Sequence, residues 1–187
     1  AGTRSAPAPA PPAGGDGDSR APPVAYFEYT HRGGDGTGPK ENQDTYFTLR
    51  VDARNYVWAV FDGHGHDNGR VAAEAARDAI RSFFEAPGNF ARLRAAPEAA
   101  MSDAFGRANA AVRAAIMAGP GVFEQDGHLV QEMDPDEYDC PLGYDVVDGG
   151  TTATVTALVD GRTLVVAAVG DSCGVLATTA PGGALRC

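Results

Sequence analysis

The sequence predicts a mixed α+β domain whose strands are antiparallel. Three segments, residues 24–29, 45–51 and 56–61, are rich in aromatic and β-branched residues and are separated by turns, which is the pattern of antiparallel hairpins. Two segments with helical periodicity follow, and both are expected to cover the sheet. The chain has 187 residues, 43% of them hydrophobic, which is enough for one domain and a tail.

Residues 1–23 are expected to form a flexible arm, because Ala, Pro, Gly, Ser and Asp bury too little apolar surface to offset the entropy of ordering. The arm is either a solvated tail or a segment that orders on a partner. The domain then spans residues 24–187, with a glycine-rich loop over residues 31–40.

The first helix is expected around residues 72–83, where small and apolar side chains recur every three or four residues, and Pro87-Gly88 ends it. A second helix begins at Pro97, because proline is favoured in the first helical turn, and stops at Gly119-Pro120. Residues 121–148 are acidic and irregular, so we expect a mobile surface insertion there.

Two strands, residues 151–159 and 163–169, are expected to pair through an Asp160-Gly161 turn. Residues 174–178 read as a further strand, and another is expected to open near Ala184. A chain that ends at Cys187 would leave a sheet edge unpaired. We therefore expect either that the natural chain continues or that a partner protein covers this edge.

The composition of the chain argues against several classes of protein. The formal charge of −10, with 15 Lys and Arg that form no dense patch, argues against nucleic acid as a partner. No segment approaches the roughly 20 apolar residues of a membrane span. Three cysteines without C-x-x-C spacing favour neither a disulfide framework nor a zinc site. We expect a reducing intracellular compartment, either the cytosol or an organelle after removal of a leader.

The stretch from Phe61 to Gly69 contains the candidate site residues. A predicted apolar strand ends here, and Asp62-Gly63-His64 follows directly at its end. A carboxylate and a peptide carbonyl are oxygen donors that Mg²⁺ and Mn²⁺ prefer. Asp44 opens a neighbouring strand and brings a second carboxylate to the same end of the sheet. The alternative for Asp-Gly is a plain turn. A zinc site at His64 and His66 lacks further ligands, and a nucleotide loop over Gly63, Gly65 and Gly69 lacks its βαβ unit.

Four motifs occur in the order and approximate spacing of the metal-dependent protein serine/threonine phosphatases of type 2C: Glu41-Asn42-Gln43-Asp44, Phe61-Asp62-Gly63-His64-Gly65, Gly149-Gly150-Thr151-Thr152-Ala153 and Val169-Gly170-Asp171-Ser172. Residues 24–187 resemble the N-terminal part of that catalytic domain. The resemblance implies a sandwich of two antiparallel sheets flanked by helices, incomplete at its C-terminal side, with two Mn²⁺ or Mg²⁺ ions at one end.

By this resemblance, Asp62 bridges the two metals, Gly63 offers its carbonyl and Asp44 holds a metal-bound water. His64 protonates the serine or threonine leaving oxygen, a role that suits a histidine side chain as a general acid near neutral pH. A water placed between two such ions attacks phosphorus directly, so no covalent phosphoenzyme is needed.

The chain also departs from the family pattern. Pro39-Lys40 stands where the family has a phosphate-binding arginine, so Lys40 or Arg32 would have to supply that charge. Gln43 replaces an acidic residue, Cys173 replaces an arginine, and the C-terminal metal-binding aspartates have no counterpart. We therefore expect a phosphatase domain for phosphoserine and phosphothreonine proteins that is inactive as residues 1–187 alone. The alternative is a non-catalytic phosphatase-like subunit that binds or supports a partner.

Overall fold

The computed structural model describes residues 24–32, 41–133, 143–179 and 185–186. The helices among them are α1 (Gly69–Glu85), α2 (Asn89–Ala95) and α3 (Pro97–Met117). The strands are β1 (Thr45–Arg50), β2 (Tyr56–Phe61), β3 (Gly63–His64), β4 (Val122–Gln125), β5 (His128–Glu132), β6 (Tyr144–Val146), β7 (Gly150–Thr151), β8 (Ala153–Val159), β9 (Thr163–Val169), β10 (Thr178–Thr179) and β11 (Leu185–Arg186). All pairings between these strands are antiparallel, so the predicted α+β class is confirmed.

The main sheet has the strand order β1-β2-β8-β9. Two sequence-local hairpins, β1–β2 and β8–β9, meet where β2 pairs with β8. The turn between β8 and β9 is Asp160-Gly161-Arg162, and Asp160 and Gly161 both have positive φ, so the predicted Asp160-Gly161 hairpin turn is confirmed. Along β8, buried residues alternate with half-buried ones, so the sheet has one core face and one open face.

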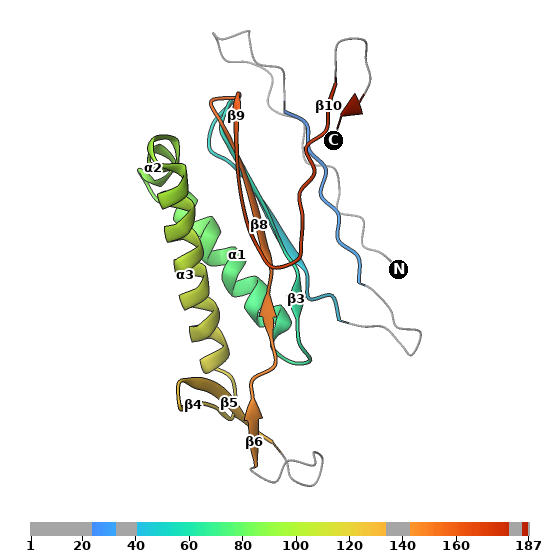
Figure 1. The fold of residues 1–187 in the computed structure, drawn as a ribbon, viewed down its shortest axis with the longest axis vertical. Coiled ribbons are helices and arrows are strands. Elements are labelled where there is room, and N and C mark those ends of the chain that lie inside the picture. Colours follow the sequence, from blue (N-terminus) through green and yellow to red (C-terminus); the bar gives the residue numbers. More distant parts are fainter. Residues whose placement is uncertain (1–23, 33–40, 134–142, 180–184, 187) are drawn as a thin grey trace.

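The helices cover the core face of this sheet (Figure 1). Val57, Ala59 and Phe61 of β2 are buried against a cluster that includes Ile80 and Phe83 of α1. Complete burial of a valine, isoleucine or phenylalanine side chain contributes about 1.5–3 kcal/mol to the stability of the fold. The helical stripe predicted for α1 is therefore confirmed, and its buried residues pack in a core that α1 shares with α3 and the sheet.

The second predicted helix begins at Pro97 as expected, with the proline in the first helical turn of α3. The sequence prediction missed α2, a seven-residue helix before it. Phe90 and Leu93 of α2 are buried, but so short a helix shows only two turns of periodicity. Arg94 binds both carboxylate oxygens of Asp160, at 2.9 and 2.8 Å, and so ties α2 to the β8–β9 turn.

Residues 121–148 are not an irregular insertion throughout, which corrects the sequence prediction. Strands β4, β5 and β6 form a three-stranded sheet, while residues 134–142 lie outside the described part of the chain. The β4–β5 turn is Asp126-Gly127, and both residues have positive φ. Asp-Gly between two short apolar segments is typical of a hairpin, but the many acidic residues in this region favoured the prediction of an irregular loop.

Two other predicted strands are absent from the described chain. Residues 24–29 make no ladder, and residues 174–177 make none either, although Thr178–Thr179 pairs with Leu185–Arg186 as a small hairpin. Aromatic and β-branched content shows suitability for a sheet, but a strand also needs a free edge to pair with. The second layer of a sandwich stays a prediction. The predicted arm, residues 1–23, lies outside the described residues.

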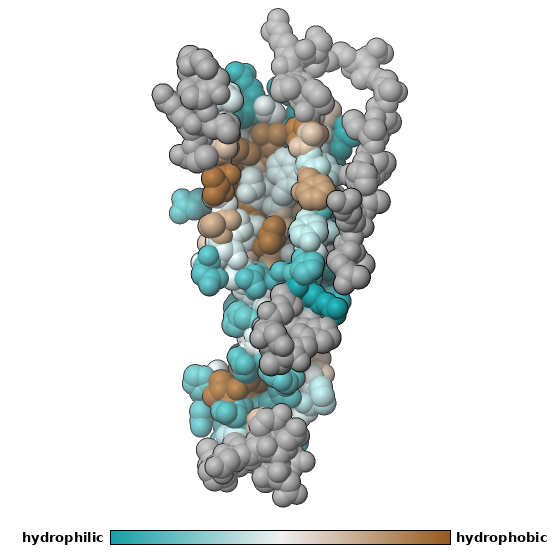
Figure 2. All heavy atoms as spheres, turned by 90° about the vertical axis from the view of Figure 1, so that its right-hand side faces the viewer, coloured by the Kyte–Doolittle hydropathy of each residue, from teal (hydrophilic) through white to brown (hydrophobic). Residues whose placement is uncertain are grey.

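The open face of the main sheet is partly covered by residues 24–32 and 170–179, which run along it on the right in Figure 1. Figure 2 views the molecule from this side and shows hydrophobic atoms gathered among hydrophilic ones. Val60, Leu164 and Val166 are exposed on this face. Within the described residues, no helix has the length and hydropathy to cross a lipid bilayer.

Candidate functional site

Asp44 and Asp62 lie opposite each other at one end of the main sheet. The β1–β2 ladder ends at the pair Thr45 and Phe61, and the next residue on each side is one of the two aspartates. Their carboxyl groups are close enough to interact. Partial burial, repulsion from Asp62 and a hydrogen bond with Asp62 together hold the pKa of Asp44 above its ordinary value. The predicted convergence of these two carboxylates is confirmed.

The backbone of Asp62 is held by Thr152. The Asp62 N–H donates to Thr152 Oγ1 at 3.1 Å, and the Thr152 N–H donates to the Asp62 carbonyl at 2.9 Å. The hydroxyl of Thr151 donates to the same carbonyl at 3.2 Å. Because Thr152 is buried, this pairing fixes where the Asp62 side chain leaves the sheet.

Hydrogen bonds connect all four sequence motifs into one network. Gln43 Nε2 donates to the carbonyl of Gly65 at 2.7 Å, which joins the first motif to the second. Thr152 joins the second motif to the third, as described above. The hydroxyls of Thr152 and Ser172 are 2.8 Å apart, which joins the third motif to the fourth. Segments far apart in the sequence thus meet around Asp62.

Gly63 is needed here for packing. A Cβ on Gly63 would collide with the carbonyl oxygen of Gly69 and would lie 2.6 Å from that of Gln43. The first turn of α1 and the residue before Asp44 therefore pack directly on the Gly63 backbone. The resemblance implies only that Gly63 offers its carbonyl to a metal, and the structure adds a steric reason for a glycine at this position.

His64 faces a different cavity from Asp44. Asp44 lines the cavity formed by residues 27–31, 44–48 and 58–60, of about 390 Å³, which we name the open-face cavity. His64 lines a cavity of about 480 Å³ between α1, α3 and β7, with Asn109 and Val112 among its other lining residues. The His64 ring lies against Gly150, where a Cβ would come within 2.7 Å of Nε2. The two cavities share no lining residue.

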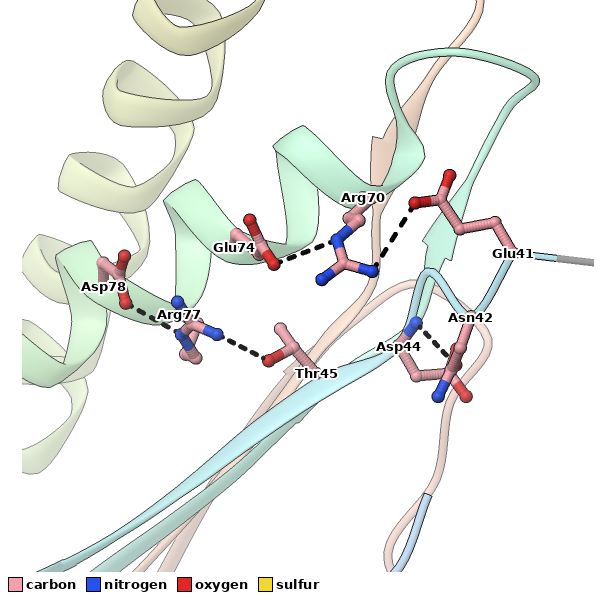
Figure 3. Close-up of polar contacts among 8 residues, drawn as sticks. All are labelled: Glu41, Asn42, Asp44, Thr45, Arg70, Glu74, Arg77 and Asp78. Atoms are coloured by element: carbon pink, nitrogen blue, oxygen red, sulfur yellow. Dashed lines mark hydrogen bonds and ion pairs between the residues drawn. The ribbon is translucent and has the colours of Figure 1, made fainter. Parts of the chain in front are cut away.

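Two arginines on α1 hold the first motif and the start of β1 against the helix (Figure 3). Arg77 donates to Thr45 Oγ1 at 2.9 Å, and Arg70 pairs with Glu41 at 3.5 Å. The Asp44 N–H donates to Asn42 Oδ1 at 3.2 Å. These contacts position the residues around Asp44, although the exposed Arg70 pair contributes little stability on its own.

The predicted phosphate-binding residues receive no support from this geometry. Arg32 is exposed and is not among the residues that line the open-face cavity. Lys40 lies outside the described residues.

Sequence reasoning missed Thr152 and the role of Gln43. Thr152 belongs to the third motif but had no predicted function, and the alternation of β8, in which Ala153 and Val155 face the core, gives no signal that Thr152 is buried. By the resemblance, Gln43 is only a departure from an acidic residue. Its amide donates to Gly65, which an ionised glutamate at this position cannot do.

The fit of a metal to this end of the sheet rests on two carboxylates and the Gly63 carbonyl. Among the described residues, no group of three or more His, Cys, Asp or Glu side chains converges on one point. In comparisons with known proteins, no family model matches the chain, and no curated protein matches it significantly.

Proposed function

We propose that this chain carries the N-terminal part of a metal-dependent protein serine/threonine phosphatase domain of the type 2C kind, with a sandwich as its complete fold. The observation that carries the proposal is the hydrogen-bonded network that gathers the four motifs around Asp62. Unrelated surface turns would have no reason to meet through three buried or half-buried contacts. The substrate class is a phosphoserine or phosphothreonine protein.

The donor set suits one divalent cation. Asp44 and Asp62 together supply two negative charges, which balance one Mn²⁺ or Mg²⁺, and the Gly63 carbonyl is a further oxygen donor. A second dication at close range would be poorly compensated by the same groups. A bound dication supplies charge for the phosphoryl oxygens and an acidified water. The role of the chain is to hold Asp62 rigidly through Thr152 and to place Asp44 beside it.

Residues 1–187 are therefore expected to bind one Mn²⁺ weakly and to hydrolyse phosphoesters little or not at all. A titration with Mn²⁺, monitored by electron paramagnetic resonance, measures the binding. An assay with p-nitrophenyl phosphate as substrate measures the hydrolysis. Asp44→Asn and Asp62→Asn are expected to abolish the site, whereas Asp78→Asn, an exposed carboxylate on α1, leaves it intact. Unchanged Mn²⁺ affinity in both Asp44→Asn and Asp62→Asn would contradict the proposed metal site. Strong hydrolysis that Asp62→Asn abolishes would overturn the expected inactivity.

A second candidate is a non-catalytic phosphatase-like subunit. The observation in its favour is that His64, the candidate acid, lines a cavity separate from that of Asp44. If Mn²⁺ binding does not depend on Asp62 while the variant remains folded, this candidate replaces the first.

A further inference from the structure

Gln43 contacts three glycines within residues 63–69, a segment that we name the glycine loop. The side-chain amide of Gln43 donates from Nε2 to the Gly65 carbonyl at 2.7 Å. A Cβ on Gly69 would lie 2.7 Å from Gln43 Oε1, and a Cβ on Gly63 would lie 2.6 Å from the Gln43 carbonyl oxygen. One residue of the first motif therefore lies against the start, the middle and the end of this loop.

This contact explains the spacing of the three glycines. Gly63 and Gly69 allow Gln43 an approach that any side chain at either position would block. Gly65 has a φ of 106°, a conformation that favours glycine, and this conformation presents its carbonyl to the glutamine amide. The glycines that suggest a nucleotide loop in the sequence thus serve a contact within the chain itself.

The contact lies just beyond the point where strand pairing ends. The ladder between β1 and β2 stops one residue short of Asp44 and Asp62. Thr152 holds the Asp62 backbone from the side of β8. Gln43 is adjacent to Asp44, and the glycine loop begins directly after Asp62, so their hydrogen bond joins the segments that carry the two carboxylates. The separation between these carboxylates is therefore set from both sides.

We propose that Gln43 is a positioning residue of the cation site, whose amide fixes Asp62 and the Gly63 carbonyl relative to Asp44. The Gly65 carbonyl only accepts hydrogen bonds, so the position requires a donor of this length. Residues that hold metal ligands in place typically change metal affinity by about 10- to 100-fold when mutated. This inference rests on the proposed function, because the role that it assigns belongs to that cation site.

The position of these contacts is compatible with a complete sandwich. Gly69 begins α1, and the helices cover the core face of the main sheet (Figure 1). Gln43 therefore meets the glycine loop on the helix side, and a second sheet on the open face would leave its contacts in place.

Gln43→Met tests the proposal, because methionine keeps the length of the side chain and removes the donor. Asn89→Ala is the matched control: Asn89 Nδ2 donates to the Phe83 carbonyl at 2.9 Å, which is the same kind of bond near the other end of α1. Both variants of the full 187-residue chain are expected to lower the melting temperature. Only Gln43→Met should weaken Mn²⁺ binding, by about tenfold or more, in a titration monitored by electron paramagnetic resonance.

Amide hydrogen exchange, measured by NMR without any cation, gives a second readout. The Asp62 N–H is bonded to Thr152 Oγ1 and the Thr152 N–H to the Asp62 carbonyl, so both amides report on the position of Asp62. In Gln43→Met they are expected to exchange about tenfold faster than in the parent, beyond the change in global stability. In Asn89→Ala they should follow global stability alone.

Gln43→Asn keeps an amide that is one methylene too short for Gly65, and it is expected to behave like Gln43→Met. Unchanged exchange at both amides in Gln43→Met, or an equal loss of Mn²⁺ affinity in Asn89→Ala, would overturn the proposal. Mn²⁺ binding by the parent that is independent of Asp44 and Asp62 would instead contradict the proposed function, and the exchange rates alone would then decide whether Gln43 positions Asp62.

Discussion

Thr152 is the residue on which the geometry at Asp62 depends most. We expect Thr152→Val to lower the free energy of unfolding by about 1–3 kcal/mol, because it keeps the shape but leaves the Asp62 N–H without its acceptor. Ser172→Ala removes only the outer hydroxyl and is expected to cost about 0.5–1.5 kcal/mol. Urea denaturation measures both. A Thr152→Val protein as stable as the parent would show that the Asp62 N–H is satisfied in another way.

The contributions of Asp44 and Asp103 to the stability of the protein are expected to change with pH in opposite directions. Burial and the neighbouring Asp62 raise the pKa of Asp44, so its contribution to stability is lost as the pH rises from the ordinary aspartate value through the raised one. Asp44→Asn should therefore raise the melting temperature at pH 7, and this gain should shrink as the pH approaches 4.

Hydrogen bonds from Arg92 and Arg107 lower the pKa of Asp103, so its contribution is present at pH 7 and lost as the pH falls through the lowered value. Asp103→Asn should lower the melting temperature at pH 7. Thermal melts of both variants between pH 7 and pH 4 check the two signs, and shifts in the same direction at pH 7 would contradict the expected environments.

At the residue scale, the sequence could predict the meeting of Asp44 and Asp62 but not the position of His64. Two adjacent antiparallel strands with a clear period of two determine which residues face each other at their ends. His64 follows Gly63 in a two-residue strand that pairs with Gly150-Thr151, and that pairing joins residues far apart in the sequence. Short local patterns carry no information about such a contact.

At the scale of elements, the contact between Gly63 and the start of α1 can be tested with two glycines. Gly63→Ala is expected to cost about 1–3 kcal/mol, because its Cβ would collide with backbone atoms that cannot rotate away. Gly106→Ala is the matched control: Gly106 lies inside α3 with open space around it, and the change should stabilise the protein by about 0.5–1 kcal/mol. Chemical denaturation measures both; a neutral Gly63→Ala would disprove the tight packing.

Elements in which apolar residues recur at a regular spacing and turn residues mark the ends were predictable. The structure has five elements close to their predicted positions: β1, β2, α1, α3 and β9. Residues 24–29 show the limit of this reasoning. Their composition suits a strand, but in the structure the segment lies along the open face without a ladder, and only tertiary context decides between the two.

At the scale of the whole molecule, the outer edge of β9 is expected to drive self-association. Within the described residues β9 pairs only with β8, and its seven residues include no charge and no proline to protect the edge. Val166→Lys should shift the protein toward the monomer. Val71→Lys on α1 is the control, since Val71 is also exposed but belongs to a helix and not to β9. Sedimentation velocity at several concentrations measures the change, and equal behaviour of the two variants would exclude β9 as the cause.

The position of β8 beside β2 has a consequence for how the protein folds. β2 and β8 are neighbours in the sheet, yet the pair Tyr56–Leu158 joins two hairpins with all three helices between them in the chain. Loop closure over such a separation is slow, whereas the contacts between α1 and α3 are more local. We therefore expect the helices and the first hairpin to form early, as an intermediate with an open β2 edge. The end of the sheet that carries Asp62 would acquire its final geometry only in the last folding step, when β8 brings Thr152 into place.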